Sequence, residues 1–374
     1  MILYFLFYII AFSLYIDDLK SFFKLSLISH SVFIMFLFEH NFGLVTYYIS
    51  DGLNYISNPE VWISDKSRAT WGYINYFEKY YDILGTKFAK ILNIPLLLIF
   101  NKQFQNLFKV YLGKINIVIL LPYFFFMSIS NLRDILILIA ILSCTTFFHK
   151  KQLKYYSISL LFFLMLFSLR PFIALLLLII FTQYFIPTLK TKLQLIRYIL
   201  VSIFSIFIFI QIFSINIDKY LYNLNYYLNE GLNDRIEFRQ AELLGSPDSP
   251  IFWIKAHLRY IFAPFPHSII SSFSDPKSFV YGSTSKVLRL INQLIYFGFL
   301  TYISLNLNKV YSVFKSLNAS AKSFLLILAS HLPIYSILHF GGVHQRTKLP
   351  FQIFIIVIGL LIWRLKKIKN VKTK

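Results

Sequence analysis

Apolar runs separated by short basic segments make up most of this 374-residue chain. Each run predicts a membrane-spanning helix. Several are shorter than the roughly 20 residues that cross a hydrocarbon core of about 30 Å, and flanking Tyr, Asn and Lys side chains can extend them to the interface. The pattern predicts an all-α fold, a polytopic transmembrane bundle of about 11 spans. The runs are Met1–Ile16, Leu25–Leu37 (with an extension to Ile49 left open), Phe88–Phe100, Ile115–Ile129, Ile135–Phe148, Tyr155–Leu169, Phe172–Ile186, Tyr198–Ile215, Val287–Leu305, Ser323–Phe340 and Phe351–Leu365.

One long polar segment, Asn216–Lys286, interrupts this pattern and holds seven of the sixteen acidic residues. Long loops of this kind usually carry function rather than mere connection. The chain therefore divides into an N-terminal transmembrane block (1–215, with an outer loop at 39–87), a large loop (216–286) and a C-terminal transmembrane block (287–374) with a basic tail.

Composition agrees with a membrane protein, because 57% of the residues are hydrophobic and only 14% are charged, against about 25% in soluble domains. The formal charge of +21 is spread in short clusters between apolar runs. That distribution follows the positive-inside rule and argues against a nucleic-acid-binding surface. The single cysteine, Cys144, lies in an apolar run, so no disulfide framework or cysteine metal site is expected.

The charges also orient the spans. The basic tail after Arg364 predicts a cytoplasmic C-terminus, and alternation then places the N-terminus on the periplasmic side. This arrangement leaves only Asp17 and Asp18 of the sixteen acidic residues on the cytoplasmic side. The first residues lack a basic region and a cleavage site, so no removable signal peptide is expected. No internal repeat is visible, which disfavours a two-fold transporter.

The predicted outer face gathers the residues that could carry chemistry. Guanidinium groups at a membrane boundary suit bidentate capture of phosphate or pyrophosphate, and a carboxylate beside them can serve as a general base. Aromatic side chains can stack on sugar rings or line an acyl-chain groove. Together these types fit an amphiphile that combines a lipid, a phosphate and a sugar. The candidate catalytic residues are Asp51, Arg133, Asp134, Arg170 and Arg346, and the candidate substrate-binding residues are Tyr55, Arg235, Arg239, His257, Arg259, His267 and His344.

Each of these residues also has a structural explanation. A lone arginine at a helix end is often an interfacial anchor, and Arg133 and Asp134 could pair with each other or cap a helix. His331 and His339 favour hydrogen bonds within a helix bundle. Asp17-Asp18 is half of a nucleotide-sugar metal motif, but its predicted cytoplasmic position beside Lys20 argues against that role. No metal site is predicted.

A series of short motifs resembles two related groups of proteins. In order along the chain these motifs are Asp51 with Tyr55, Leu92-Asn93, Leu132-Arg133-Asp134, Leu169-Arg170-Pro171, Pro264-Phe265-Pro266, and Arg346 with Leu349-Pro350. The series resembles the GT-C type integral-membrane glycosyltransferases and the O-antigen polymerases of bacterial surface-polysaccharide clusters. It covers nearly the whole chain as an order of weak motifs. The chain departs from GT-C enzymes in lacking a second acid beside Asp51 and a soluble C-terminal domain.

The resemblance implies an enzyme of the bacterial inner membrane that uses undecaprenyl-pyrophosphate-linked oligosaccharides at the periplasmic face, without nucleotide sugars or cofactors. Asp51 would match the catalytic base, and the three motif arginines would match residues near the lipid phosphate. The first expectation is a polymerase that joins repeat units, with a chain-length regulator as a candidate partner. A GT-C transferase adding one sugar is the first alternative. A lipid-linked oligosaccharide flippase is more distant, because it would need symmetric halves and charges deep in the spans.

Overall fold

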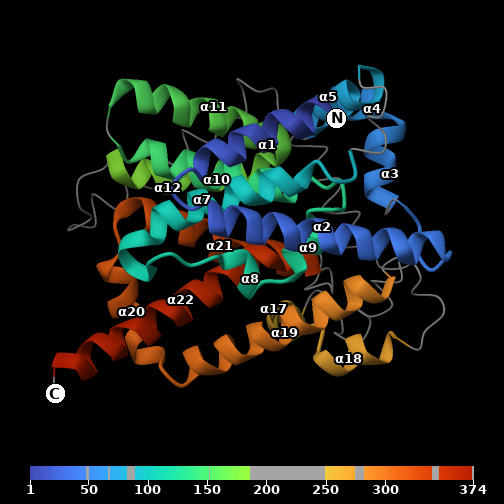
Figure 1. Ribbon diagram of the computed structural model, residues 1–374. Coiled ribbons are helices and arrows are strands. Elements are labelled where there is room, and N and C mark those ends of the chain that lie inside the picture. The colour runs from blue at the N-terminus through green and yellow to red at the C-terminus, as the bar shows by residue number, and fades with distance from the viewer. Residues whose placement is uncertain are drawn as a thin grey trace. The chain divides into compact units, whose positions relative to one another are not determined.

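The computed structural model describes residues 1–47, 50–65, 68–81, 89–150, 152–185, 249–273, 282–338 and 345–372, and within these ranges every regular element is a helix (Figure 1). Three helical stretches are long and apolar enough to cross a membrane: Leu19–Asn41, Gly282–Ser304 and Arg346–Leu365. The all-helical class is confirmed for the described residues, and these stretches indicate a membrane protein. A bundle of about eleven spans is not confirmed.

The helices fall into two compact units, each described here by itself. Unit 1 comprises residues 1–171, 265–325 and 352–374, and unit 2 comprises 172–264 and 326–351. Unit 1 contains α1 (Ile2–Leu14), α2 (Leu19–Asn41), α3 (Ser50–Ser57), α4 (Pro59–Ser64), α5 (Ala69–Tyr80), α7 (Asn93–Leu112), α8 (Ile117–Leu120), α9 (Tyr123–Met127), α10 (Asp134–Phe148), α11 (Leu153–Leu169), α18 (Pro266–Ser271), α19 (Gly282–Ser304) and α20 (Leu307–Ser316). Unit 2 contains α12 (Pro171–Phe185) and α17 (Pro250–Phe262), while α21 (Ala319–Leu338) and α22 (Gln345–Lys372) contribute residues to both.

Local sequence explains where several helices begin and end. Asp18 accepts a hydrogen bond from the amide of Ser21 and so caps α2, and Asp134 lies in the first turn of α10, where a carboxylate favours the helix dipole. Pro171 opens α12, a position where proline loses no helical hydrogen bond. Gly113 ends α7 with a φ of 72°, a conformation that other residues rarely adopt.

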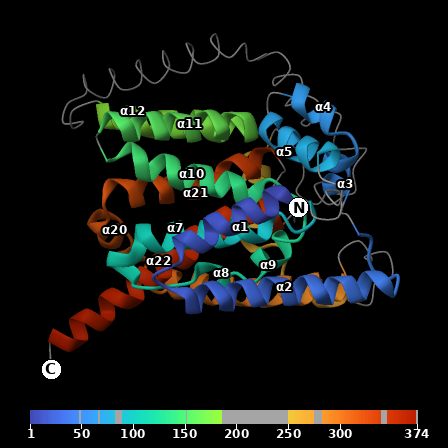
Figure 2. The same ribbon diagram turned by 45° about the horizontal axis from the view of Figure 1, so that its top comes forward.

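One end of unit 1 is defined by contacts between segments far apart in the sequence. The N-terminal amine of Met1 contacts Glu78 on α5, and the Glu39 carboxylate near the end of α2 accepts hydrogen bonds from Thr284 in the first turn of α19. Figure 2 shows α3, α4 and α5 together beside the N-terminus. This end therefore contains the termini of α1, α2 and α19 that the charge pattern assigns to the outer face.

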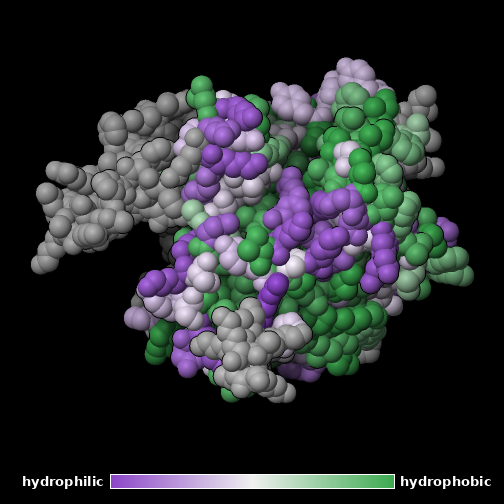
Figure 3. Space-filling view, turned by 60° about the vertical axis from the view of Figure 1, so that its left-hand side comes forward, coloured by the Kyte–Doolittle hydropathy of each residue, from purple (hydrophilic) through white to green (hydrophobic). Residues whose placement is uncertain are grey.

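The opposite end of unit 1 joins other helix termini. The Tyr111 hydroxyl accepts a hydrogen bond from the amide of Asn318 at 2.8 Å, and His149 contacts the Ser323 hydroxyl at 3.0 Å. Exposed lysines are frequent in the same connections, namely Lys109, Lys114, Lys150, Lys154 and Lys315. Figure 3, which brings this side forward, shows hydrophilic residues gathered across the middle of the face with hydrophobic residues beside them. Lysines at one end of apolar helices are typical of the cytoplasmic boundary.

Two predicted segments differ from the structure. The segment Asn101–Lys114 was expected to be a loop, but α7 continues through it to Leu112 and buries Asn101, Lys102 and Gln105. The apolar run Ile115–Ile129 forms two short helices, α8 and α9, because the chain leaves helical geometry at Leu121 just before Pro122. Pro122 disfavours helical geometry at the residue before it, which explains the break.

Two glycines allow helices to meet closely at the end of unit 1 that contains the N-terminus. A Cβ atom on Gly72 would lie 2.7 Å from the backbone nitrogen of Ile63 and 2.8 Å from the carbonyl carbon of Trp62, so only glycine permits this packing of α5 against α4. Gly282 has a φ of 60°, and a Cβ there would lie 2.2 Å from Glu39 Oε2. Gly72 therefore permits the close packing of α5 on α4, and Gly282 permits the close approach of the start of α19 to Glu39 on α2.

Candidate functional site

The turn Asn131–Arg133, which connects α9 to α10, is the centre of the candidate site in unit 1. Asn131 is fully buried and has a φ of 47°, a left-handed conformation that asparagine tolerates better than most residues. Its side-chain amide donates to Asn75 Oδ1 at 2.9 Å and to the carbonyl oxygen of Gly52 at 3.2 Å. Asn131 therefore attaches the outer helices α3 and α5 to this turn.

Three of the five predicted catalytic residues meet beside that turn. Arg170 Nη2 lies 3.0 Å from Asp134 Oδ1, and the two side chains are only 12% and 16% exposed. Arg133 Nη1 donates to the carbonyl oxygen of Leu169 at 2.7 Å. Asp134 thus pairs with the arginine 36 residues away and not with its neighbour Arg133. The arrangement brings two guanidinium groups and one carboxylate to one end of α10 and α11.

Buried neutral polar side chains lie in the turn and in the segments that contact it. Asn93 donates to the carbonyl oxygen of Leu132 at 2.7 Å. Its own Oδ1, the Oδ1 of Asn131 and the indole nitrogen of Trp71 are buried and have no hydrogen-bond partner among the described residues. Burying an unpaired polar atom costs about 1–3 kcal/mol, so such a concentration suits a ligand or water that supplies the missing partners. Amide and indole groups suit sugar hydroxyls in particular.

Asn75 and Trp71 were missed as site residues in the sequence, and Asn93 was recognised only as part of a motif. The prediction of site residues relied mainly on charged side chains, and these three residues lie in segments of another character. The helix α5 is aromatic and amphipathic, and Asn93 opens an apolar helix. A buried Asn in an apolar context was the available clue, because buried amides must find partners.

The other predicted residues of unit 1 contribute in different ways. Asp51 lies on α3 next to Gly52, whose carbonyl oxygen contacts Asn131, but its side chain lies outside the described part of the chain. Tyr55 is buried and packs on Trp62 with ring centroids 5.2 Å apart, which is a packing role. His267, on α18, stacks on Phe265 at 5.7 Å.

Glu78 is a further buried carboxylate near these helices, and its contacts are structural. It lies at the N-terminus of α1, where a carboxylate is favoured by the helix dipole, and contacts the Met1 amine at 3.0 Å. Burial raises the pKa of the Glu78 carboxyl. This residue therefore holds α1 against α5 rather than facing the Asp134–Arg170 pair.

Unit 2 holds three predicted residues on two packed helices. His257 and Arg259 lie on α17, and Arg346 lies in the first turn of α22. The helices are joined by Tyr260, whose hydroxyl donates to the carbonyl oxygen of Thr347 at 2.9 Å, and by buried Lys348, which donates to the carbonyl oxygens of Arg259 and Ala263. Arg235, Arg239 and His344 lie outside the described residues.

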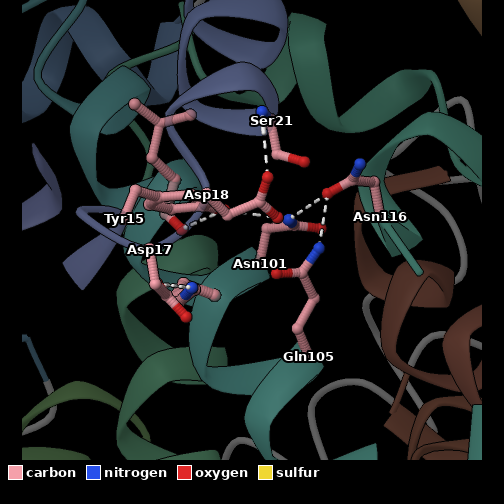
Figure 4. A network of polar contacts seen from close by, with 9 residues as sticks. Tyr15, Asp17, Asp18, Ser21, Asn101, Gln105 and Asn116 are labelled. Carbon is pink, nitrogen blue, oxygen red and sulfur yellow. Dashed lines mark hydrogen bonds and ion pairs between the residues drawn. The ribbon is translucent and has the colours of Figure 1, made fainter. Parts of the chain in front are cut away.

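The second polar network of unit 1 involves the Asp17-Asp18 segment (Figure 4). Asp17 pairs with Lys102 at 2.6 Å, and this hydrogen bond holds the pKa of Asp17 below its ordinary value of 3.8. Asn101 donates to Tyr15 at 2.9 Å and to Asn116 at 2.8 Å. Asp18 caps α2, so both acids have structural partners.

Comparison with models of protein families, with curated proteins and with solved structures found no match to this chain.

Proposed function

We propose that this protein is a membrane polymerase that joins polyprenyl-pyrophosphate-linked oligosaccharide repeat units into a surface polysaccharide of the O-antigen kind. The observation that carries this proposal is the meeting of Arg133, Asp134 and Arg170 at one end of α10 and α11, next to buried amides. A membrane-boundary site with guanidinium groups for phosphate and amides for sugar hydroxyls suits an amphiphilic lipid-linked sugar. The proposed location is the inner membrane, with the N-terminus and this site on the periplasmic side.

In the proposed reaction, a hydroxyl at the non-reducing end of one lipid-linked unit attacks the anomeric carbon of another. The new glycosidic bond forms as the bond from that carbon to the pyrophosphate oxygen breaks, and the hydroxyl proton passes to a carboxylate. Arg133 and Arg170 stabilise the negative charge on the departing pyrophosphate. The motif resemblance gives Arg346 a phosphate-binding role as well. Asp51 or Asp134 accepts the proton or orients the hydroxyl. The pyrophosphate is already an activated leaving group, so the reaction needs no ATP and no redox cofactor.

A GT-C type transferase that adds a single sugar from a polyprenyl phosphate is the second candidate. The position of Asp51 one residue before the Gly52–Asn131 contact favours it, because a carboxylate on an outer helix is the expected base of such an enzyme. A flippase fits less well, since the group formed by Arg133, Asp134 and Arg170 lies at one end of α10 and α11 rather than near the middle of the helices.

The test is the glycan ladder of a clean deletion strain, complemented with native protein, Arg133→Ala, Arg170→Ala or Arg346→Ala at matched expression. Arg68→Ala is the control, because the contacts of Arg68 are local: it pairs with Asp65 at 3.6 Å and lies 4.5 Å from the centre of the Trp62 ring. The polymerase proposal predicts a core carrying one repeat unit and no ladder in the deletion, copied by the three variants and not by the control. A persistent ladder with shifted mobility would instead indicate a decorating transferase.

A further inference from the structure

The helix α19 carries a polar stripe within a stretch long and apolar enough to cross a membrane. At about 100° per residue, its polar positions fall within an arc of about 120° and extend over about 16 Å of the helix axis. These residues are Ser285, Lys286, Arg289, Asn292, Gln293 and Tyr296. All are buried except Arg289, which is half-buried. Polar and ionisable residues inside membrane helices are costly, so such a stripe is a functional hypothesis by default.

Lys286 is the charged group of the stripe that is best defined. It is 7% exposed and donates to the carbonyl oxygen of Ser272 at 2.8 Å, with its ammonium 5.6 Å from the centre of the Phe273 ring. No carboxylate among the described residues forms an ion pair with it. A buried ammonium without a counter-ion is unfavourable, and an anionic ligand would supply one.

Two neighbouring polar atoms of α19 also have no partner within the part of the chain that the structure describes. These are the Ser285 hydroxyl oxygen and Asn292 Oδ1, both in side chains that are at most 1% exposed. The amide of Asn292 donates to Gln352 on α22 at 2.9 Å, and Gln352 donates to Gln293 at 3.1 Å. The carboxamides thus link α19 to α22 while leaving an acceptor on the stripe.

The backbone at the start of α19 is not the ligand site. Glu39 already occupies it, since its carboxylate accepts from the amide and the hydroxyl of Thr284 at 2.7 and 2.8 Å. Among the described residues, Glu39 forms no ion pair with Lys286, so the buried ammonium of Lys286 keeps an uncompensated positive charge. A ligand would therefore be held by side chains slightly deeper than the helix start, about 5–10 Å along the axis.

We propose that Ser285, Lys286 and Arg289 form a binding site for the phosphate of a membrane lipid, separate from the Asp134–Arg170 pair. Its place in catalysis rests on the proposed function: a reaction that joins two lipid-linked units must hold two lipid phosphates, and the Arg133 group accounts for one. Lys286 and Arg289 bind the phosphate oxygens through charge-assisted hydrogen bonds, and the Ser285 hydroxyl donates a third.

The binding test uses purified full-length protein in phosphatidylcholine nanodiscs and counts bound geranylgeranyl phosphate by native mass spectrometry. Native protein is expected to bind it, and Lys286→Gln to lose one binding event or weaken it at least about tenfold, as expected for losing one charge-assisted bond. Lys315→Gln removes an exposed lysine on α20 and is the matched control, with unchanged binding expected. Unchanged binding in folded Lys286→Gln overturns the proposal.

Further arms keep the test decisive. Should Lys286→Gln fail to fold, Ser285→Ala is expected to weaken the same event about three- to tenfold, and unchanged affinity there overturns the site. Nanodiscs with phosphatidylglycerol and buffers with inorganic phosphate identify the source of the phosphate. If either one competes with geranylgeranyl phosphate in a way that depends on Lys286, the result supports the site. The assay needs no sugar, so binding lost in Lys286→Gln with a normal ladder in the deletion strain would refute the polymerase and keep the site. Unchanged binding in Lys286→Gln, together with loss of the ladder in the deletion strain, would refute the phosphate site and leave the polymerase proposal standing.

Discussion

The buried Asp134–Arg170 pair can be separated into structural and functional parts by a double-mutant cycle. The cycle compares native protein with Asp134→Asn, with Arg170→Gln and with the double variant. Each single substitution leaves one charge without its partner in a position where the side chains are only 12% and 16% exposed. The double variant instead leaves two neutral amides of similar size, which can hydrogen-bond to each other.

The expected magnitudes follow from the geometry. At a separation of 3.0 Å the Coulomb attraction is about 5–6 kcal/mol for an effective dielectric constant of about 20. Desolvation of the two ions offsets much of that attraction, so the pair itself adds little net stability. Removing one partner leaves the other charge buried without compensation for its desolvation. The free energy of unfolding of each single variant should therefore fall by about 3–5 kcal/mol. The double variant should lose only about 1–2 kcal/mol, which gives a coupling energy of at least about 4 kcal/mol.

The assay is unfolding by sodium dodecyl sulfate in mixed micelles, followed by tryptophan fluorescence. The partly exposed pair Arg68–Asp65 is the matched control, because its atoms are 3.6 Å apart and its side chains are 36% and 35% exposed. Its cycle, with Asp65→Asn and Arg68→Gln, should give a coupling energy below about 1 kcal/mol. Additive losses at Asp134 and Arg170, with the double variant worse than either single, would refute the description of a buried compensated pair.

Two further predictions concern the packing of the outer helices and the network at the other end of unit 1. Gly72→Ala should lose about 1–3 kcal/mol or more in the same unfolding assay, because its Cβ would contact the backbone of Ile63 and Trp62. Gly298→Ala is the control and should be neutral or slightly stabilising, since nothing lies within 4 Å of its added methyl group and alanine favours a helix. The lowered pKa of Asp17 means that its bond to Lys102 stabilises the protein above about pH 4 and is lost as the pH falls through the folded-state value. Asp17→Asn should therefore reduce the difference in melting temperature between about pH 6 and about pH 3, and an unchanged difference would show that this bond contributes nothing.

The hydrophobic pattern predicted most helices because each apolar run has few ways to bury its backbone in a membrane. Because consecutive spans have similar lengths, their connecting turns lie at one end of the bundle or the other. Arg133 precedes α10 and Arg170 follows α11, so the two arginines meet at the same end, as expected. The partner of Asp134 could not be predicted in the same way. That choice depends on how α10 and α11 are rotated about their axes, and both helices are apolar on all sides.

Polar residues inside apolar runs were the main source of error, and the two cases differ in what the sequence contained. In α7, the helix continues past Asn101 because Asp17, Tyr15 and Asn116 supply partners from distant segments. No periodicity within α7 shows those partners, so the predicted loop at Asn101–Lys114 was a reasonable but wrong reading. In α19, by contrast, Lys286, Arg289 and Gln293 recur at intervals of three and four residues, which is the signature of one helix face. The mean hydropathy of the run does not reveal this face. The spacing of the polar residues around the helix does, and it indicates a helix with one polar side. The position of a charge around the helix, and not only its position along the chain, therefore separates a membrane boundary from a polar surface within the bundle.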